Sequence, residues 1–548
     1  MDNFKDFDKF QKDQEKLAMT LADSLGMDYY DLQVNKPSVE ALKVVDEEVA
    51  LKLKVIPIKK DLNTIILGVV DPFNPEVETL KQKLENEGLK VSLAIISNQS
   101  FDIAKDDYKF ISRRKISYAK VFEVNTDVIN DVNQNIDNRE DLQKVMLRTL
   151  EESPFFLLDY VLAGALKFNA SDIHFEPYEK KAIIRYRLDG LLYDVCELSQ
   201  TAYDLIKNRI KVLSGLMINV TNKPQDGSFS LTVINKKIDI RVSIIPVGIN
   251  EAIVLRVLDF SQIKVNLEDL GFREDDLEFL NEAIAAPNGL ILNTGPTGSG
   301  KTTTLYSILM KIKDPTIKIV TVENPIEYKI EGISQTQVDE TKGLTFASAL
   351  RAFLRHDPDV ILVGEIRDKE TADTAIQAAL TGHLVLSTLH TNDTLGAIPR
   401  LFSLGVDVKL IPSALRLIIA QRLLRQICSN CKEEYSADED LIKKIKAKLI
   451  DLPKRVKTSF NFDYTNLKLA KGKGCDKCFN TGYKGRIGIF EFLRMSKALE
   501  ELIYQKPSEA EILKAIKDDF VSLQQDALIK ALEHKTTIEE VERITGLI

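Results

Sequence analysis

The chain has 548 residues, of which 44% are hydrophobic and 28% are charged, a composition typical of a soluble globular protein with about three or four domains. Its net charge of −8 and the lack of a long Lys or Arg block argue against a nucleic-acid-binding protein. The charged N-terminus and the lack of an apolar run of roughly 18 residues predict neither a secretory signal nor a membrane span, so we expect a cytoplasmic protein whose membrane association is indirect.

Residues 1–108 are predicted to form a small α/β domain. The segments VIPIKK and TIILGVVDPF resemble strands, and EVETLKQKLENEG has helical spacing with a glycine where the helix should stop. From 109 to 150 the chain is rich in Asn and Asp and weakly periodic, so a flexible linker is expected. A second N-terminal domain, of α+β type, is expected over 151–262 because strand-like segments such as KKAIIRYRLDG and KKIDIRVSIIPV alternate there.

Residues 263–548 follow a different pattern. The apolar segments GLILNT, IKIVTVENP, DVILVGEI and HLVLSTLH alternate with the helical stretches TTLYSILMKIKD, FASALRAFLRHD and ETADTAIQAALTG. This alternation predicts an α/β domain with a largely parallel sheet, whose ligands bind beyond the carboxyl ends of the strands. Each of these strands ends in polar residues, so the chemistry is expected at that edge.

A glycine-rich turn follows the first of these strands. The segment GPTGSGKTTT fits G-x-x-x-x-G-K-[ST] between a strand and a helix, the context of a P-loop, although a glycine-rich turn without a ligand is the alternative. Backbone N–H groups would approach the phosphates, Lys301 would reach the β and γ oxygens of ATP, and the Thr302 hydroxyl would ligate Mg²⁺. The predicted nucleotide-binding residues are Gly295, Pro296, Thr297, Gly298, Ser299, Gly300, Lys301, Thr302 and Thr303.

A P-loop needs an acidic group on a neighbouring strand to hold the metal or to orient water. Glu365 ends the strand VILVGE, and Glu323 ends the strand in TVENPIE; the alternative for each is a solvated carboxylate at a strand end. His383 and His390 flank the strand LVLSTL. His390 ends a third strand, which suits a group that senses the γ-phosphate, although a structural histidine is as compatible with the sequence.

Four of the five cysteines form two C-x-x-C pairs separated by 43 residues: Cys428 with Cys431, and Cys475 with Cys478. Four thiolates suit tetrahedral Zn²⁺ and leave no open position, so a structural zinc site is predicted in an insert at about 426–480. A redox C-x-x-C or a chance pair is the alternative. The fifth cysteine, Cys196, is expected to be a small core residue.

Several segments resemble those of the secretion-system ATPases, within the assembly class of type IV pilus extension and type II secretion motors. GPTGSGKTTT is similar to the Walker A box, TVENPIEY to the Asp box, LRAFLRHDPDVILVGEIRD to the Walker B box and GHLVLSTLHTND to the His box. NASDIHFEP, RYRLDG, PQDG and CDKCFNTGYKGRIGIFE also look like family segments. The resemblance covers nearly the whole chain, and residues 1–108 resemble a type II secretion docking domain.

This resemblance implies a RecA-like P-loop ATPase core in a homohexamer that converts ATP hydrolysis into subunit motion. In the family this motion acts on an inner-membrane platform protein and drives assembly of a type IV pilus or a pseudopilus. We therefore expect a cytoplasmic protein that is peripheral at the inner membrane, with a cytoplasmic docking protein as a further partner. The implied roles are phosphate binding for Lys301, Mg²⁺ binding for Thr302 and Glu365, and general base for Glu323 unless Glu365 shares that role.

Arginine fingers that reach a neighbouring subunit's γ-phosphate are also implied. The candidates lie on strands of the second domain, where a solvated strand face is the alternative: Arg185, Arg187, Arg241 and Arg256. Two positions depart from the family pattern, since Asn324 stands where aspartate is usual and Ser228 where arginine is usual. Each removes a charge near the metal or between subunits, but the lysine, threonine, glutamates and histidines remain, so activity is still expected.

Two other functions compete with the motor. A nucleic-acid translocase would show DNA-stimulated hydrolysis with steep salt dependence, and the acidic balance argues against it. A non-hydrolysing scaffold, in which ATP only sets the shape of a ring, is kept open by Asn324 and Ser228. Retraction motors of the same superfamily are disfavoured because they generally lack the large N-terminal domain and the tetracysteine insert.

Overall fold

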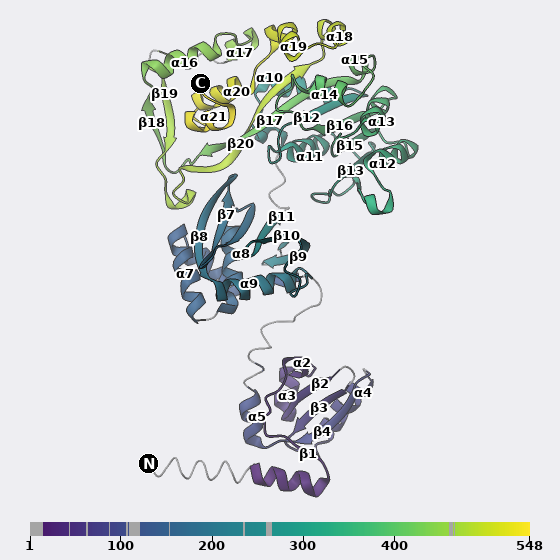
Figure 1. Ribbon diagram of the computed structural model, residues 1–548, viewed down its shortest axis with the longest axis vertical. Helices are drawn as coiled ribbons and strands as arrows, with labels where there is room; N and C mark the ends of the chain where they lie inside the picture. The colour runs from purple at the N-terminus through teal and green to yellow at the C-terminus, as the bar shows by residue number, and fades with distance from the viewer. Residues whose placement is uncertain are drawn as a thin grey trace. The chain divides into compact units, whose positions relative to one another are not determined.

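The protein is represented by a computed structural model that describes residues 15–42, 44–61, 64–86, 88–105, 108, 121–152, 154–233, 236–258, 266–459, 464 and 466–548. The chain divides into two compact units, residues 1–119 and residues 120–548, and Figure 1 labels most of their helices and strands. None of the helices in the described ranges is both long enough and apolar enough to cross a bilayer.

The first unit is built on a four-stranded sheet with the order β1-β4-β3-β2. Strands β3 and β4 are parallel and joined through helix α4, whereas β2 and β3 are antiparallel. Ile65, Leu67 and Val69 alternate along β3 and are buried in the core, as the two-residue period of a strand requires. The strands and helix predicted in this region are confirmed. The elements are β1 (Asp28–Tyr29), α2 (Val39–Leu42), α3 (Glu47–Leu53), β2 (Val55–Asp61), β3 (Thr64–Val69), α4 (Pro75–Asn86), β4 (Lys90–Ile95) and α5 (Asn98–Ala104).

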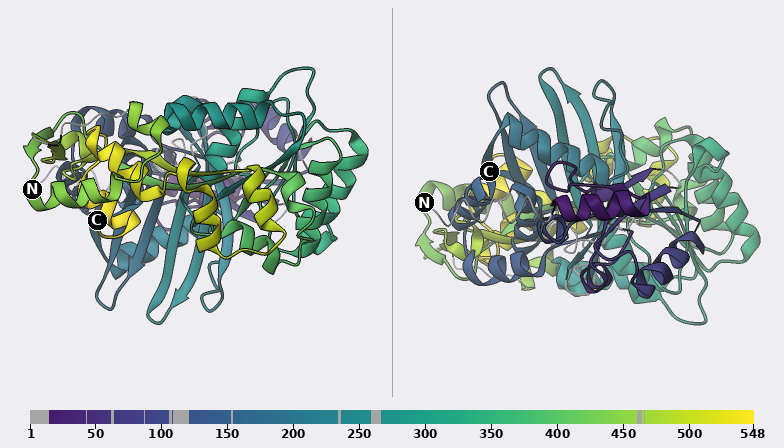
Figure 2. Two further views of the ribbon diagram at one scale, coloured as in Figure 1. Left: turned by 90° about the horizontal axis from the view of Figure 1, so that it is seen from above. Right: turned by 90° about the horizontal axis from the view of Figure 1, so that it is seen from below.

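The second unit begins with a seven-stranded sheet of order β5-β9-β10-β11-β6-β7-β8, whose long blue and teal strands lie side by side in Figure 2. All its neighbouring strands are antiparallel except the β5–β9 pair. The elements are β5 (Val121–Glu123), α6 (Thr126–Asn135), α7 (Arg139–Glu152), α8 (Leu157–Lys167), β6 (Asp172–Pro177), β7 (Lys181–Leu188), β8 (Leu191–Ser199), α9 (Gln200–Leu213), β9 (Gln225–Val233), β10 (Lys236–Val247) and β11 (Asn250–Leu258).

The prediction of a flexible linker over 109–150 is wrong for residues 121–150; residues 109–120 lie outside the described ranges. Strand β5 extends the sheet, and helices α6 and α7 pack on the same core as α8. Val128, Val132 and Met146 are buried there, although polar residues surround them in the sequence. A single apolar face is enough to bury a helix, and the many Asn and Asp residues of this segment lie on the other face.

A second seven-stranded sheet, of order β14-β13-β15-β16-β12-β17-β20, forms the centre of the last part of the chain. Its strands are parallel except for β20, which pairs antiparallel with β17. Leu290 and Leu292 face a core with residues of α12 and α13, whereas Ile291 faces a core with residues of α10 and α11. Helices cover both faces, so the strands are continuously apolar and the predicted α/β architecture is confirmed.

The strands and helices predicted from alternating sequence segments are those observed. The elements are α10 (Glu274–Ala285), β12 (Gly289–Thr294), α11 (Lys301–Ile312), β13 (Ile319–Glu323), β14 (Ser334–Gln337), α12 (Phe346–Phe353), β15 (Val360–Val363), α13 (Lys369–Leu380), β16 (Leu384–Leu389), α14 (Ala397–Ser403), α15 (Ile411–Ala414) and β17 (Leu415–Ile427). The tetracysteine insert and the C-terminal helices follow, with β18 (Lys432–Ser436), α16 (Glu439–Leu449), α17 (Lys454–Ser459), β19 (Lys468–Gly472), β20 (Tyr483–Arg494), α18 (Lys497–Ile503), α19 (Glu509–Ile516), α20 (Leu523–Leu532) and α21 (Ile538–Thr545).

A buried network of charges joins the C-terminal helices to the sheet. Arg273 donates to Asp526 at 2.9 Å and to Asp276 at 2.6 Å, and Lys530 pairs with Asp526. The second oxygen of Asp526 accepts from the backbone N–H of Phe490 in β20 at 2.8 Å. Burial opposes ionisation of Asp526, but Lys530 and Arg273 outweigh it and lower the pKa of this carboxyl group. The network therefore depends on Asp526 carrying its charge.

The variant Asp526→Asn is expected to lower the free energy of unfolding by about 3–5 kcal/mol, because Arg273 and Lys530 would stay buried without their shared counter-charge. Urea unfolding followed by circular dichroism measures this change. The matched control is Asp518→Asn at an exposed position, which should shift the midpoint little. Equal shifts in the two variants would show that the network does not stabilise the domain.

The same network predicts a pH dependence of stability. Burial, only partly offset by Arg273, raises the pKa of Asp276 to about 7. The folded protein then holds this proton at pH values where the unfolded chain has released it, so stability is lost as the pH rises from about 4 through 7. The slope is on the order of 1 kcal/mol per pH unit, and it should be smaller in Asp276→Asn. Melting temperatures of both proteins between pH 5 and 8 test this; parallel curves would contradict it.

Candidate active site

The P-loop joins β12 to α11 and is held against strand β17. A Cβ atom at Gly295 would lie 2.6 Å from the Gln421 carbonyl oxygen, and one at Gly300 would lie 2.7 Å from Gln421 Nε2. The positive φ angles, 150° at Gly295 and 90° at Gly300, also favour glycine. Both glycines are therefore required by close contact with β17 as well as by the turn.

The side chain of Gln421 lies beneath this loop and is 1% exposed. Its Oε1 accepts from Asn293 Nδ2 at 3.1 Å and from Thr304 Oγ1 at 2.8 Å. These bonds connect the strand before the loop to the helix after it. The loop is thus anchored on both sides by one buried amide.

Two polar groups of the P-loop are placed to meet phosphate. Lys301 Nζ donates to the carbonyl oxygens of Gly295 at 2.8 Å and Pro296 at 3.0 Å, so the ammonium group lies over the loop. Burial and the Arg422 guanidinium lower the pKa of Lys301, while Glu365 raises it. Ser299 Oγ is buried and has no hydrogen-bond partner in the described part of the chain. Such a group, beside the N-terminus of α11, fits the oxygen of a bound phosphate.

The other P-loop residues divide by exposure. Gly295 is buried, and Gly300, Lys301 and Thr303 are half-buried. Other residues of the loop are exposed, on the side that would face a ligand. Those exposed residues are Pro296, Thr297, Gly298 and Thr302. The exposed Thr302 hydroxyl, at the start of α11, is open to a metal ion.

Glu365 and His390 are brought together from the ends of neighbouring strands. His390 Nε2 lies 3.0 Å from Glu365 Oε2, and Arg367 Nε lies 2.6 Å from the same oxygen. Lys301 begins α11, directly after the loop that follows β12, so it belongs to the same carboxyl edge of the sheet. An acid, an imidazole and the P-loop lysine are thus all carried by this edge, as the strand ends predicted.

Glu323 has a different environment. Its carboxylate is 3% exposed and accepts from Tyr306 on α11, from Thr321 Oγ1 at 2.5 Å and from Gln335 Nε2 at 3.2 Å. Three donors occupy the oxygens of this buried carboxylate and leave little access for water. This geometry favours a role in holding α11 against β13 and does not favour Glu323 as the general base.

His383 lies at the other end of β16 from His390. Its Nδ1 donates to the Ala378 carbonyl oxygen at 2.9 Å, at the end of α13. This is a structural contact, so the two flanking histidines have different surroundings and only His390 joins the site. Asn324 is exposed directly after Glu323.

Three of the four candidate arginines gather in one row across the second unit's antiparallel sheet. The strand register places Arg241 opposite Arg256, Arg256 opposite Asp172, and Asp172 opposite Arg187. Asp172 pairs with Arg256 at 2.9 Å and with Arg187 at 3.3 Å, while Arg241 pairs with Glu327 at 3.2 Å. Ser228 lies opposite Arg241 on β9, so the departure at Ser228 leaves this row with one charge fewer than an arginine there would give.

The fourth arginine stands apart from this row. Arg185 pairs with Asp194 at 2.8 Å and with Glu176 at 3.1 Å. These two carboxylates belong to the strands on either side of β7. Arg185 is therefore ion-paired with two carboxylates of its own sheet.

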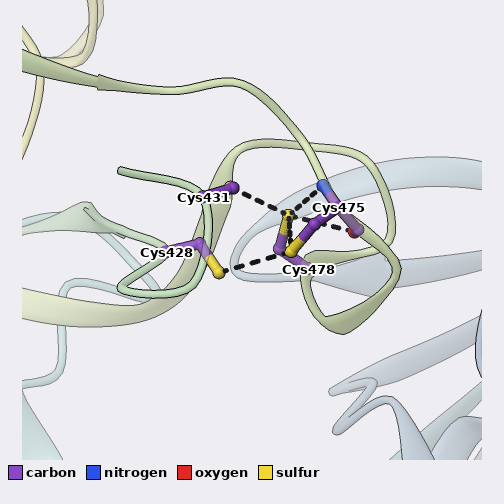
Figure 3. Close-up of side chains that lie close together, drawn as sticks. All are labelled: Cys428, Cys431, Cys475 and Cys478. Carbon is purple, nitrogen blue, oxygen red and sulfur yellow. Dashed lines mark hydrogen bonds between the residues drawn. The ribbon is translucent and has the colours of Figure 1, made fainter. Parts of the chain in front are cut away.

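The four cysteines of the insert converge on one point (Figure 3). The distances between sulfur atoms are 3.9 Å for Cys428 and Cys475, 3.8 Å for Cys431 and Cys478, and 3.7 Å for Cys475 and Cys478. A tetrahedral metal with bonds of about 2.3 Å to sulfur separates its ligands by roughly 3.8 Å, whereas a disulfide needs about 2.05 Å. The cluster therefore fits a metal ion and excludes a disulfide between these cysteines.

A cavity of about 450 Å³ borders the P-loop on the side of Gly300 and Thr303. Tyr483 and Arg425 line it, and the Arg425 guanidinium lies 3.9 Å from the centre of the Tyr483 ring. This volume lies within the range of about 300–1,000 Å³ found for small-molecule sites. The cavity can accept the part of a nucleotide that extends beyond the phosphates.

Sequence reasoning missed Arg367, Gln421 and Arg422. Arg367 directly follows the Walker B strand, and only its contact with Glu365 reveals it. Gln421 and Arg422 interrupt the apolar run LRLIIAQRLL, and a polar pair inside a central strand was the available signal. Their partners lie on segments about 30 to 130 residues away, which the sequence pattern does not indicate.

Residues 151–543 match the family described as Type II/IV secretion system protein. The chain belongs to this family. It is an ATPase of the secretion and pilus ATPase class, as the P-loop and the resemblance predicted. Residues 25–107 match the MshEN domain.

Curated relatives extend this result. The chain is 44% identical to type II secretion system protein E of Pseudomonas aeruginosa over 389 residues, which cover 71% of this chain and 75% of that protein. It is 36% identical to the type IV pilus assembly ATPase PilB of Myxococcus xanthus over 540 residues, which cover 96% of this chain and 91% of that protein. The solved structure of the ATPase DotB from Yersinia pseudotuberculosis is 21% identical, with a TM-score of 0.50 over 71% of this chain and 93% of that one, and shares the fold.

Proposed function

We propose that the protein is a homohexameric motor in which ATP hydrolysis drives subunit motion for the assembly of a type IV pilus or a secretion pseudopilus. The observation that carries the proposal is a complete phosphate-binding loop beside the Glu365–His390 pair. The alignment over 96% of the chain with a protein named a pilus assembly ATPase supports the pilus branch. The alignment with type II secretion system protein E supports the secretion branch.

The P-loop would bind the β and γ phosphates of ATP. Lys301 exchanges its two carbonyl acceptors for phosphate oxygens, and the Ser299 hydroxyl gains the partner that it lacks. Thr302 and Glu365 would hold Mg²⁺, which neutralises charge on the transferred phosphoryl group. The base and ribose fit the cavity beside Gly300 and Thr303.

Hydrolysis requires a group that orients water and accepts its proton. We assign this role to Glu365, because it follows β15 at the sheet edge that carries the P-loop and contacts His390, while the carboxylate of Glu323 is enclosed by donors. His390 orients the Glu365 carboxylate. Glu323 supports catalysis through the position of α11.

Arg187, Arg241 and Arg256 are proposed to act on a neighbouring subunit's nucleotide. Arg241 and Arg256 lie directly opposite each other on adjacent strands, an arrangement of like charges that is unfavourable unless anions compensate it. Asp172 and Glu327 supply two carboxylates for the three guanidinium groups, and a γ-phosphate would complete the compensation. Arg185, with two carboxylates of its own sheet, is the weakest of the four candidates.

The tetracysteine cluster is proposed to hold Zn²⁺, because four sulfur ligands in a closed tetrahedron suit this ion and leave no position for chemistry. The site would anchor the insert to β20. The domain over residues 1–108 is proposed to dock a cytoplasmic protein of the machine. The inner-membrane platform protein would receive the motion, which places the motor at the cytoplasmic side of that membrane.

The motor predicts platform-dependent ATP hydrolysis. Steady-state phosphate release by the purified protein should be stimulated by the platform protein and abolished in Lys301→Ala. Glu365→Gln should bind ATP but hydrolyse it at least about 100-fold more slowly, because the group that activates water is lost. Tight ATP binding without turnover in the unmodified protein would instead support the nucleotide-dependent scaffold.

The metal site predicts about one zinc ion per chain by elemental analysis, in keeping with a four-sulfur site. Cys475→Ser should lose most of the metal and lower the melting temperature, since binding energy at a structural zinc site is folding energy. Cys196→Ser, which removes the cysteine outside the cluster, should keep the metal. Full zinc occupancy in Cys475→Ser would contradict the proposed ligand set.

A further inference from the structure

The loop that follows β16 crosses the carboxyl edge of the sheet and is fastened to each strand that it passes. We call residues 390–394 the crossing loop. It starts at His390, the residue that contacts Glu365, and it passes in order over β12, β17 and β20, which are consecutive neighbours in the sheet. Its contacts therefore decide where His390 lies.

The first attachment is to β12. Thr294, the residue before the P-loop, places its Oγ1 2.9 Å from the Thr391 backbone nitrogen and 2.6 Å from Thr391 Oγ1. The last attachment is to β20, where Glu491 Oε1 accepts from Thr394 N at 2.8 Å and from Thr394 Oγ1 at 2.6 Å. Both Thr294 and Glu491 are buried, so these ends of the loop are firmly held.

The middle attachment is made by a charged side chain of β17. Arg422 Nη2 donates to the Asn392 carbonyl oxygen at 2.6 Å, and Nη1 donates to the Gln421 carbonyl oxygen at 3.0 Å. The same guanidinium lies 3.1 Å from the position that a Cβ atom of Gly295 would take. Arg422 thus touches the crossing loop and the first residue of the P-loop together.

The charge environment agrees with this position. Burial lowers the pKa of the Arg422 guanidinium, and the carboxylates of Asp393 in the crossing loop and of Glu491 in β20 oppose this shift. The guanidinium that bonds to Asn392 is therefore also attracted by the negative charges of the crossing loop and β20.

We propose that Arg422 is a positioning residue for ATP hydrolysis: it fastens the crossing loop to the P-loop and so keeps His390 against Glu365. This inference rests on the proposed roles of Glu365 and His390. It adds a mechanical link within one chain between the loop that binds phosphate and the loop that carries the imidazole. The residue is not expected to contact the reacting atoms.

The strand offers a matched control. Arg416, near the start of β17, donates from Nε to the Asn288 carbonyl oxygen at 3.2 Å and from Nη2 to Asn288 Oδ1 at 3.3 Å. It also joins β17 to the chain of β12, but at the residue directly before β12, at the edge of the sheet away from the P-loop. Arg416→Met and Arg422→Met therefore remove similar contacts from one strand at different edges of the sheet.

Kinetics give the first test. Arg422→Met should lower kcat about 10- to 100-fold, the range expected for a misplaced catalytic group. Its affinity for a non-hydrolysable ATP analogue should change less than about threefold, and Arg422→Lys, which keeps the charge and one donor, should recover part of the rate. Arg416→Met should leave kcat unchanged. An equal loss in Arg416→Met, or a loss of analogue affinity as large as the loss of kcat, would overturn the proposal.

A double-mutant cycle with His390→Gln separates positioning from general destabilisation. If Arg422 acts through His390, the double variant should be no more than about threefold slower than His390→Gln alone. If the loss of kcat in the double variant instead equals the product of the losses in the two single variants, Arg422 acts independently of His390.

Hydrogen exchange tests the link without requiring turnover. In Arg422→Met, backbone amides of residues 390–396 should exchange at least about tenfold faster, because the loop loses its middle attachment. Arg416→Met should show the exchange rates of the unmodified protein. Unchanged exchange in Arg422→Met would overturn the inference even if the protein hydrolyses ATP, whereas faster exchange in a protein without turnover would overturn only the assignment of Glu365 and His390.

Discussion

The contact between strand β17 and the P-loop is the constraint on which the site depends. Gln421 lies beneath the loop and bonds to residues before and after it, and the absence of side chains at Gly295 and Gly300 lets the two segments meet. A parallel pairing of β12 and β17 brings Thr294 level with Ala420, so the loop starts beside Gln421. The position of the phosphate-binding amides is therefore set by a strand that lies about 125 residues later in the chain.

Several buried polar and charged side chains near the P-loop and strand β20 form hydrogen bonds or ion pairs with one another. Glu323 holds the P-loop helix to β13 through Tyr306, and Glu491 holds the crossing loop to β20. The network around Asp526 attaches α20 to β20. Burial of each of these groups has a desolvation cost, which is offset only when both partners of a contact are in place. Together the contacts therefore favour one arrangement of the sheet edge over others.

Several predictions from the sequence were confirmed by the structure because they depend on properties of short segments. The segments GLILNT, DVILVGEI and HLVLSTLH are apolar throughout because helices cover both faces of their sheet, and this local property is visible without a fold. The P-loop motif and each C-x-x-C pair are likewise local. The linker predicted over 109–150 failed for residues 121–150, because α6 and α7 bury one narrow apolar face, which a composition rich in Asn and Asp conceals.

The sequence by itself determined most strands and helices of residues 263–548, the P-loop, the two C-x-x-C pairs and the family, because each of these follows from short segments whose residues are near one another in the chain. Tertiary structure alone decided that Glu365, rather than Glu323, meets His390, and that Gln421 and Arg422 belong to the site. It also decided that three arginines form a row around Asp172. These relations arise from strand order and register, which bring together groups that are far apart in the sequence. No local sequence pattern determines which strands become neighbours in a sheet.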